Sequence, residues 1–301
     1  MAEQPEETGS LAPASSLFVQ CILPGMGQAE ENPGDYRDND GILHCGVCKK
    51  PKEMALSLFG DDAPPSTVRI LCDCQQKALD AEDARAAAQR RRIQNEEAIE
   101  TLLELGAALP FTYDFSQYDG GSDKNCQQAR YYAEHFDRML RENVGLMLYG
   151  DTGRGKTFFS ESIGQELLKQ GYMVYYTRIG KIADACSANN GRDRTFVMNA
   201  VSRADLLILD DLGAERDTPY MLEQADTIIN TRYISKRPLI TTTNLHPRDL
   251  VSAEDLAHKR PYERIMEMCR PVEIIGENRR TAIAAKRSAA WQRLLEEDKP
   301  E

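Results

Sequence analysis

The stretch GDTGRGKT at residues 150–157 follows the apolar run VGLMLYG (144–150) and opens a helical pattern over 156–170. It fits G-x-x-x-x-G-K-T, in which glycines allow a tight turn whose backbone N–H groups face phosphate oxygens. The start of the following helix adds unpaired N–H donors and a positive dipole. A glycine-rich turn that carries Lys-Thr by chance is disfavoured, because strand, loop and helix stand in the required order. The sequence therefore predicts a phosphate-binding loop.

The residue types in this loop suit ATP and Mg²⁺. The Lys156 ammonium is expected to neutralise the β- and γ-phosphates, and the Thr157 hydroxyl is expected to ligate Mg²⁺. The other loop residues are expected to contact the phosphates as well: Gly150, Asp151, Thr152, Gly153, Arg154 and Gly155.

A second acidic motif, LLILDDLG at 206–213, completes the expected site. A buried strand that ends in two carboxylates needs partners or a metal for them, because desolvated charges are costly. We expect Asp210 to hold the Mg²⁺ water shell and Asp211 to face the attacking water. The alternative is a solvated Asp-Asp turn. Aspartate is one methylene shorter than the glutamate of many ATPases, so we expect slow turnover.

The chain from Phe111 onward alternates short apolar runs with helical segments, which predicts βαβ units and a parallel sheet covered on both faces. The fold class is therefore α/β, with a parallel five-stranded sheet. The expected strands are 144–150, 173–179, 204–211, 237–244 and 270–277. The expected helical segments are 156–170, 181–203, 218–235 and 255–268.

Four of the eight cysteines are clustered as Cys45-x₂-Cys48 and Cys72-x-Cys74. Zinc in structural sites takes four such thiolates, and the surrounding segment has too few large apolar residues to fold without a metal. The adjacent His44 is an alternative ligand in place of one cysteine. The competing interpretation is four free thiols.

Composition shifts divide the chain further. A helix-rich run without proline precedes Pro110, which is expected to end it. The expected organisation is a disordered acidic tail (1–40), a zinc module (41–75), a linker helix (76–107), an ATPase domain (108–290) and a C-terminal tail (291–301).

The net charge of −11 arises mostly in the first forty residues. A protein that grips duplex DNA through phosphate neutralisation should carry a basic excess, so any nucleic-acid contact is expected to be local, weak or made through a partner. No apolar run is long enough to span a membrane, and the acidic N-terminus is unlike a secretory signal, so we expect a cytoplasmic protein without a membrane partner.

Taken together, GDTGRGKT, LLILDDLG, ITTTNL (240–245), KRPYERI (259–265) and GENRR (276–280) resemble the AAA+ ATPases of the DnaC/DnaI helicase-loader family and their relatives, the IstB-type transposition helpers. The resemblance covers about residues 108–290. It implies an AAA+ P-loop fold, and the cysteine cluster is similar to the N-terminal zinc module of DnaI-like loaders.

The resemblance also implies roles for three polar residues. Asn244 matches the sensor that orients the lytic water, although an asparagine here is also a good helix cap. Arg264 matches the arginine finger that enters a neighbouring subunit's site, with Arg260 as the other candidate. Arg280 matches the second sensor, with Arg279 as the other candidate. For Arg264 and for Arg280, the alternative interpretation is a solvated residue on the surface of a helix.

The implied function is ATP-dependent loading of a replicative helicase onto single-stranded DNA, with weak, ATP-dependent DNA binding and self-association through composite ATP sites. The runner-up is a transposition helper that acts with a transposase on duplex DNA, and a third interpretation is an ATP-binding signalling module. The separate zinc module and the missing basic excess favour the loader.

Overall fold

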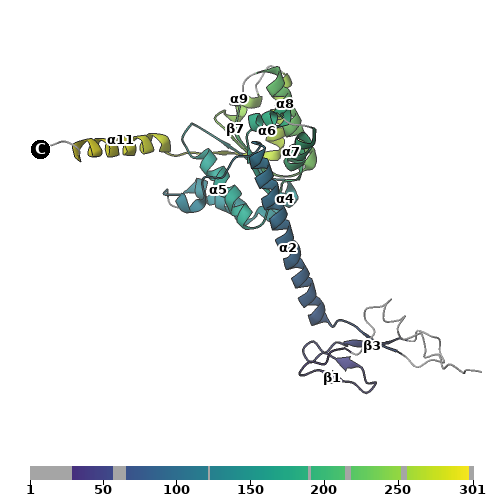
Figure 1. Ribbon diagram of the computed structural model, residues 1–301. Helices are drawn as coiled ribbons and strands as arrows, with labels where there is room; N and C mark the ends of the chain where they lie inside the picture. The colour runs from purple at the N-terminus through teal and green to yellow at the C-terminus, as the bar shows by residue number, and fades with distance from the viewer. Residues whose placement is uncertain are drawn as a thin grey trace, which may run out of the picture. The chain divides into compact units, whose positions relative to one another are not determined.

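The computed structural model describes residues 29–56, 66–120, 123–188, 191–213, 218–251 and 256–297 (Figure 1). The chain divides into two compact units, Met1–Ala88 and Gln89–Glu301. Each unit is described by itself below.

The second unit is built on a five-stranded parallel sheet with the strand order β6-β7-β8-β5-β9. Its strands are β5 (Gly145–Tyr149), β6 (Val174–Thr177), β7 (Leu206–Leu212), β8 (Leu239–Thr243) and β9 (Cys269–Glu273). This confirms the predicted fold class. Each expected strand is present, and the apolar run at 270–277 forms a strand that begins one residue earlier and ends four residues sooner.

Successive residues of each strand face opposite sides of this sheet, so two hydrophobic cores form. Leu207 and Leu209 of β7 belong to one core, and Leu206 and Ile208 belong to the other. Every residue of the run LLIL is buried, because helices pack on both faces.

Within the described residues, seven main helices form the two covering layers. The first core includes residues of α6 (Ile179–Ala188), α7 (Gly191–Arg203), α8 (Pro219–Ser235) and α10 (Leu256–Met268). The second includes residues of α3 (Lys124–Glu134), α4 (Phe136–Glu142) and α5 (Lys156–Lys169). The short helices η1 (Phe115–Gln117) and α9 (Pro247–Val251) lie in loops. The expected helical segment 181–203 thus forms parts of two helices, α6 and α7.

The long linker helix is α2 (Asp73–Glu104), which begins and ends three residues earlier than predicted. Gly106, and not Pro110, ends it. Gly106 has φ +68°, a left-handed conformation that glycine adopts without strain, and the N–H groups of Ala107 and Ala108 then donate to the Leu102 carbonyl.

The first unit contains two small antiparallel pairs, β1 (Tyr36–Arg37) with β2 (Leu43–His44) and β3 (Glu53–Leu56) with β4 (Ser66–Arg69). The prediction of a disordered tail over 1–40 is wrong for residues 29–40, which belong to this folded module. Residues 1–28 lie outside the described residues. The Lys52 ammonium donates to the Glu30 carbonyl (2.5 Å) and to Asp35 (2.6 Å). The buried Glu53 accepts from the Ala29 N–H at 2.9 Å. Polar contacts of the buried Lys52 and Glu53 thus hold residues 29–40 to the module, which composition alone does not reveal.

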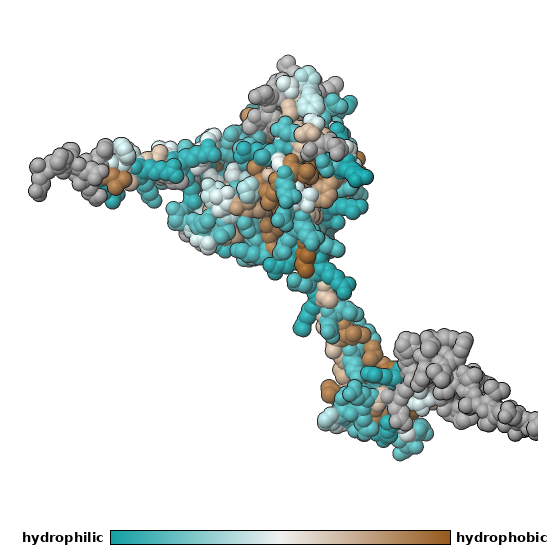
Figure 2. All heavy atoms as spheres, in the orientation of Figure 1, coloured by the Kyte–Doolittle hydropathy of each residue, from teal (hydrophilic) through white to brown (hydrophobic). Residues whose placement is uncertain are grey.

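The last helix, α11 (Arg279–Glu297), continues through most of the predicted C-terminal tail 291–301. Good helix formers without glycine or proline fill it, which explains the extension. Figure 2 shows mostly hydrophilic residues along it. Within the described residues, no helix is long and apolar enough to cross a membrane.

Candidate nucleotide and metal sites

The loop GDTGRGKT connects β5 to α5, at the carboxyl edge of the parallel sheet. Its close packing requires glycine at position 153, where φ is +82° and an added Cβ would lie 2.1 Å from the Asn278 side-chain oxygen. The Arg279 N–H donates to the Gly153 carbonyl at 3.0 Å. The loop is therefore held against the segment that opens α11.

Lys156 lies in the first turn of α5, and its ammonium is surrounded by oxygen acceptors. It donates to the Gly150 and Asp151 carbonyls (2.8 and 2.9 Å) and to Oδ1 of Asn244 (2.7 Å). Burial lowers the pKa of Lys156, while the Asp211 charge acts in the opposite direction. A desolvated cation of this kind suits an anionic ligand.

Asp210 lies at the buried end of β7, and its Oδ1 accepts two hydroxyl hydrogen bonds. The donors are Thr157 (2.9 Å) and Thr242 (2.8 Å). A carboxylate and a threonine hydroxyl side by side are the oxygen donors that Mg²⁺ takes in nucleotide sites. Thr157 and Asp210 are thus the residues that fit Mg²⁺.

Asp211 adopts a left-handed backbone conformation, with φ +57°. The pairing of β7 with β8 shifts register between Leu209 and Leu212, so the chain bulges at this point. The Asp211 N–H donates to Oγ1 of Thr242 at 2.9 Å. Such strain at the end of a central strand re-aims a side chain, and here Asp211 lines the same pocket as Lys156.

This pocket has a volume of about 370 Å³ and is lined from five separate parts of the second unit. It unites most of the predicted nucleotide-site residues. Its lining residues include Thr152, Gly153, Gly155, Lys156, Thr157, Asp211, Asn244, Arg279 and Arg280. Asn244 does not act only as a helix cap, because its side chain accepts from Lys156.

The two candidate sensor arginines differ in their contacts. The Arg279 guanidinium stacks on Tyr118 at 4.6 Å and bonds to Asp119. Arg280 is exposed at the pocket, and its charge contributes to the lowered pKa of Lys156. Both arginines line the pocket, so the choice of Arg280 as the sensor stays a prediction.

The two candidate finger arginines lie on α10. Nη1 of Arg264 is 2.6 Å from Oδ1 of Asp226 on α8. Arg260 is exposed. Neither lines the nucleotide pocket of its own chain.

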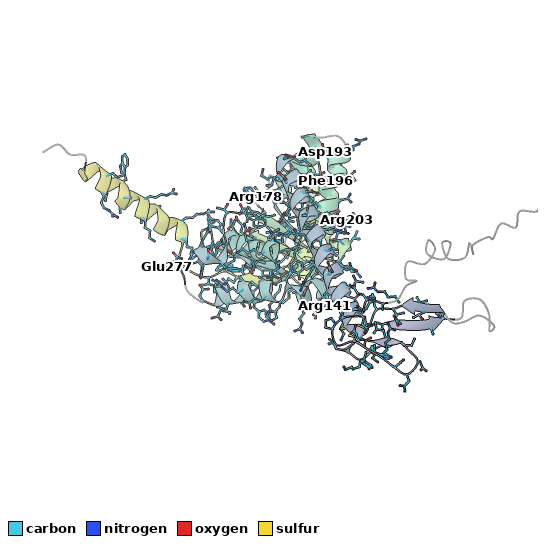
Figure 3. All side chains as sticks on the ribbon, turned by 60° about the horizontal axis from the view of Figure 1, so that its bottom comes forward. Arg141, Arg178, Asp193, Phe196, Arg203 and Glu277 are labelled. Atoms are coloured by element: carbon cyan, nitrogen blue, oxygen red, sulfur yellow. The ribbon has the colours of Figure 1, made fainter. Side chains whose placement is uncertain are left out.

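Sequence reasoning missed Arg178, the residue after β6 (Figure 3). Its Nη2 lies 2.9 Å from Oδ2 of Asp210 and 3.0 Å from Oδ2 of Asp211. The hydrogen bond to Asp210 raises the pKa of Arg178. An arginine after a strand carries no signal of its own, because these partners become neighbours only when β6 pairs with β7.

Tyr113 is a second residue that sequence reasoning missed, and it also lines the pocket. The buried carboxylate of Glu161 on α5 accepts from the N–H groups of Thr112 and Tyr113 (2.5 and 3.0 Å). This contact fixes the segment before η1 beside the phosphate loop. The aromatic run FTYDF (111–115) was the feature of the sequence that could have indicated this role for Tyr113.

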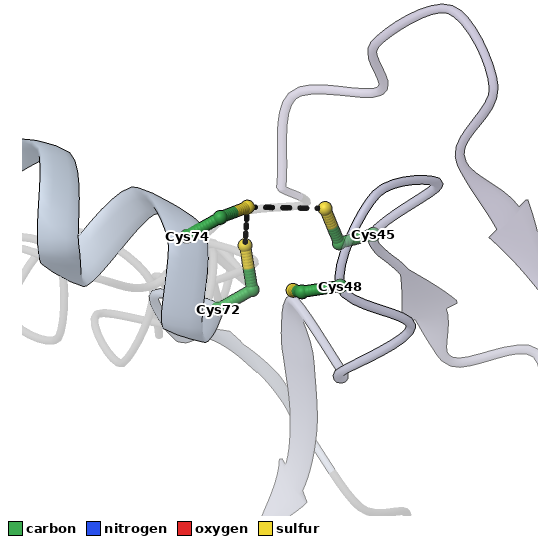
Figure 4. Close-up of side chains that lie close together, drawn as sticks. All are labelled: Cys45, Cys48, Cys72 and Cys74. Carbon is green, nitrogen blue, oxygen red and sulfur yellow. Dashed lines mark hydrogen bonds between the residues drawn. The ribbon is translucent and has the colours of Figure 1, made fainter.

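The four cysteines of the first unit converge, as Figure 4 shows. Their sulfur atoms all lie within 4.8 Å of one another, with Cys74 3.4 Å from Cys45 and 3.3 Å from Cys72. Sulfurs bound tetrahedrally to zinc at 2.3 Å lie about 3.8 Å apart. The donor set therefore fits zinc.

Local backbone geometry explains the two cysteine spacings. Cys45 and Cys48 lie in a turn that the Lys49 N–H closes on the Cys45 carbonyl at 2.9 Å. Cys72 directly precedes α2 and Cys74 lies in its first turn. Backbone N–H donors lower the pKa of Cys48 to about 6, which favours the thiolate that binds metal.

The alternative in which His44 replaces a cysteine is wrong. Its Nε2 lies 2.8 Å from Asp38 and its Nδ1 lies 3.3 Å from the Lys49 carbonyl, so both ring nitrogens have partners other than the cluster. The hydrogen bond to Asp38 raises the pKa of His44.

Similar proteins were found among curated sequences and solved structures. The replicative helicase loader DnaI of Bacillus subtilis (strain 168) is 30% identical over 148 residues, which cover 45% of this chain and 47% of the relative. The replicative helicase loader DnaC of Escherichia coli (strain K12) is 29% identical over 123 residues, covering 39% and 49%. A crystal structure of DnaI matches with a TM-score of 0.46 and 24% identity, covering 57% of this chain and 94% of that one. The chain thus spans about half the length of the curated relatives it matches.

The match to a protein family is longer than any of these. Residues 76–287, which include most of α2 and nearly all of the sheet-bearing unit, match the family described as IstB-like ATP binding protein. The matched range contains the phosphate loop, both carboxylates at the end of β7 and the candidate arginines. The chain therefore belongs to the family of IstB-like ATP binding proteins.

Proposed function

We propose that this protein is an ATP-hydrolysing loader of a replicative helicase. The observation that carries the proposal is that each of the two compact units holds a different candidate site. One holds four converging cysteines, and the other holds the nucleotide pocket with Lys156, Asp211 and Asn244. A small metal-held module is a rigid docking surface, which suits an adaptor. Two relatives that carry the name replicative helicase loader support the same reading.

In the proposed reaction, ATP binds with its phosphates on the loop between β5 and α5. Lys156 neutralises the β- and γ-phosphates. Thr157 and Asp210 would hold Mg²⁺, which would spread the developing charge. Asn244, 2.7 Å from Lys156, orients the attacking water, and Asp211 accepts its proton. Arg280 contacts the γ-phosphate.

Hydrolysis is proposed to depend on assembly, because Arg260 and Arg264 of the chain are not among the described residues that line its own pocket. An arginine of α10, Arg264 or Arg260, would enter the site of a neighbouring copy. An arginine supplied in this way contributes about 10³–10⁵ in rate. Slow hydrolysis by the isolated chain follows.

The proposed partners are a replicative helicase, bound through the zinc module, and single-stranded DNA, bound weakly and with ATP. Zinc held by Cys45, Cys48, Cys72 and Cys74 would stabilise the docking surface. ATP is not required for that contact, because the nucleotide pocket lies in the other unit.

The test is co-purification of the full-length protein with the host's replicative helicase, with and without ATP. Wild type should retain the helicase in both conditions, and Cys72→Ser should lose it. Cys186→Ser on α6 serves as the matched control, since it removes a thiol outside the module. Retention by Cys72→Ser, or no capture by wild type, would overturn the loader function.

The family match favours a second candidate, a transposition helper that acts with a transposase on duplex DNA. This candidate predicts ATPase stimulation by duplex DNA and capture of a transposase. The loader predicts neither.

A further inference from the structure

The helix α11 is strongly basic in an acidic chain. Residues 279–294 include five arginines and lysines and no aspartate or glutamate, whereas the whole chain has a net charge of −11. Arg279, Lys286 and Arg293 recur at intervals of seven residues, which places them in one row along the helix. Arg280 and Arg287 form a second, adjacent row. The cations therefore share one half of the helix surface.

The far part of this face is open to solvent. Lys286, Arg287 and Arg293 are all exposed, as are Trp291 (62%) and Leu294 (55%). Trp291 lies four residues after Arg287, so the indole and the guanidinium are neighbours on the surface. It is also the single tryptophan of the sequence. We define the α11 basic face as Lys286, Arg287, Trp291 and Arg293.

The same helix begins at the nucleotide pocket. Its first residue, Arg279, donates its N–H to Gly153 of the phosphate loop, and Arg280 lines the pocket. Figure 3 shows α11 following directly on the segment that contains Glu277. A nucleotide bound at the pocket therefore contacts the first turn of the helix whose later turns carry the basic face.

We propose that the α11 basic face binds a single-stranded polynucleotide. Lys286 and Arg293 are separated by about 10 Å along the helix, so they can contact different phosphates of one strand. The Trp291 indole offers a flat surface on which any unpaired base can stack, with the neighbouring Arg287 on the phosphate side. The inference rests on the proposed function for its ligand, single-stranded DNA, and names where that ligand binds.

Charge favours this ligand over the alternatives. A docking surface for a protein usually surrounds a large apolar centre with charges, but this face has cations beside a single aromatic ring. A membrane-bound helix needs a broader apolar face than Trp291 and Leu294 provide. An apolar groove of about 430 Å³ beside β9 is large enough for an indole, so contact between copies is one outcome of the test.

Because ATP and the strand would bind to one helix, their affinities should be coupled. ATP at Arg280 is expected to tighten binding of the strand, and the strand must then tighten ATP binding by the same factor.

The test uses the fluorescence of Trp291 in the full-length protein, which reports only this site. Titration with unlabelled dT20 and ATP should quench the emission to saturation, and anisotropy of fluorescein-labelled dT20 should give the same affinity. Stacking and phosphate contacts do not need a 2′-hydroxyl, so rU20 should bind comparably, while a 20-base-pair duplex should quench little. With three cations engaged, log affinity should fall against log salt with a slope of about −2.

Variants then separate the contributions. Replacing Lys286, Arg287 and Arg293 together by alanine should weaken dT20 binding at least tenfold and flatten the salt dependence, with ATP affinity in the absence of DNA unchanged. The matched control removes three exposed cations from α2, by alanine at Lys77, Arg85 and Arg90, and should bind dT20 like wild type.

Each other outcome overturns the inference. If dT20 binds by anisotropy without quenching Trp291, the strand binds elsewhere, and the loader function stands. If helicase is captured but no polynucleotide binds, this inference alone fails. If the Trp291 emission shifts with protein concentration in the absence of DNA, the α11 basic face binds another copy of the chain. If the emission shifts only with anionic phospholipid vesicles, the face binds a membrane.

Discussion

Nη2 of Arg178 lies 2.9 Å from Oδ2 of Asp210, the buried carboxylate whose other oxygen accepts from Thr157. The same guanidinium nitrogen lies 3.0 Å from Asp211. One cation thus engages both carboxylates assigned to Mg²⁺ and to the attacking water. Because the Arg178 side chain is partly exposed, it can move away from the two carboxylates without disrupting the core.

Arg178→Ala is expected to strengthen Mg²⁺-dependent ATP binding and to raise the basal rate of hydrolysis. Removing the guanidinium frees Oδ2 of Asp210 for the metal's water shell and leaves Asp211 free to accept a proton. The expected gain is up to about tenfold, the equivalent of about 1.4 kcal/mol. The measurement is ATPase rate against Mg²⁺ concentration.

Arg178→Lys keeps the charge and is the control, with an expected Mg²⁺ requirement close to that of wild type. A large loss of hydrolysis in Arg178→Ala would instead show that Arg178 assists the reaction.

Lys156→Ala should abolish most ATP affinity. Its ammonium is partly desolvated among oxygen acceptors, and it is the cation of the pocket that lies on the helix directly after the phosphate loop. Charge-assisted hydrogen bonds of this kind contribute about 2–3 kcal/mol, so binding should weaken about 30- to 150-fold. Titration calorimetry with Lys169→Ala, an exposed lysine on the same helix, provides the matched comparison. Equal ATP affinity in both variants would contradict the site.

Asp211→Asn should separate binding from chemistry. The amide keeps the size of the side chain but cannot take the proton from water, so hydrolysis should fall at least about 100-fold. ATP binding should remain within a few-fold of wild type, because Lys156, Thr157 and Asp210 are intact. Single-turnover hydrolysis and calorimetry on the same preparation measure the two effects.

Much of the sheet could be predicted because its signals are local. The run LLIL before Asp210 is apolar at every position, as a strand covered on both faces requires. The phosphate loop is equally local, since strand, glycines and helix follow one another within a few residues. These features depend on neighbours in the sequence.

The contacts that sequence reasoning missed are long-range. Arg178 meets Asp210 only through the pairing of β6 with β7, and Arg264 meets Asp226 only through the packing of α10 on α8. Residues 29–40 look disordered by composition, yet the burial of Lys52 and Glu53 organises them. In each case the partner of a charged residue follows from the tertiary fold.

Zinc removal should unfold the first unit alone. Wild type is expected to contain one zinc per chain by elemental analysis, and Cys72→Ser to contain none. Because the module has few apolar contacts, hydrogen exchange in 29–56 should become fast in this variant, while 145–149 in the central strand β5 stays protected. Cys186→Ser should retain zinc. Zinc-free wild type with a protected module would rule out the metal's structural role.

Arg264→Ala should bind ATP normally and hydrolyse it poorly, because the proposed finger acts on a neighbour's ATP. The ion pair with Asp226 does not prevent this, since both side chains are partly exposed and such pairs contribute about 0–1 kcal/mol. Mixing Arg264→Ala with Lys156→Ala should restore activity, because one intact composite site forms between an intact loop and an intact finger.

Arg260→Ala tested in the same mixtures decides between the two arginines, since only the finger variant should complement. Asp226→Asn adds a second readout. If Arg264 is the finger, releasing it from Asp226 should preserve or raise hydrolysis, and the rate per chain should increase with protein concentration. If neither arginine variant complements Lys156→Ala at any mixing ratio, the composite site is wrong and hydrolysis is a property of the single chain.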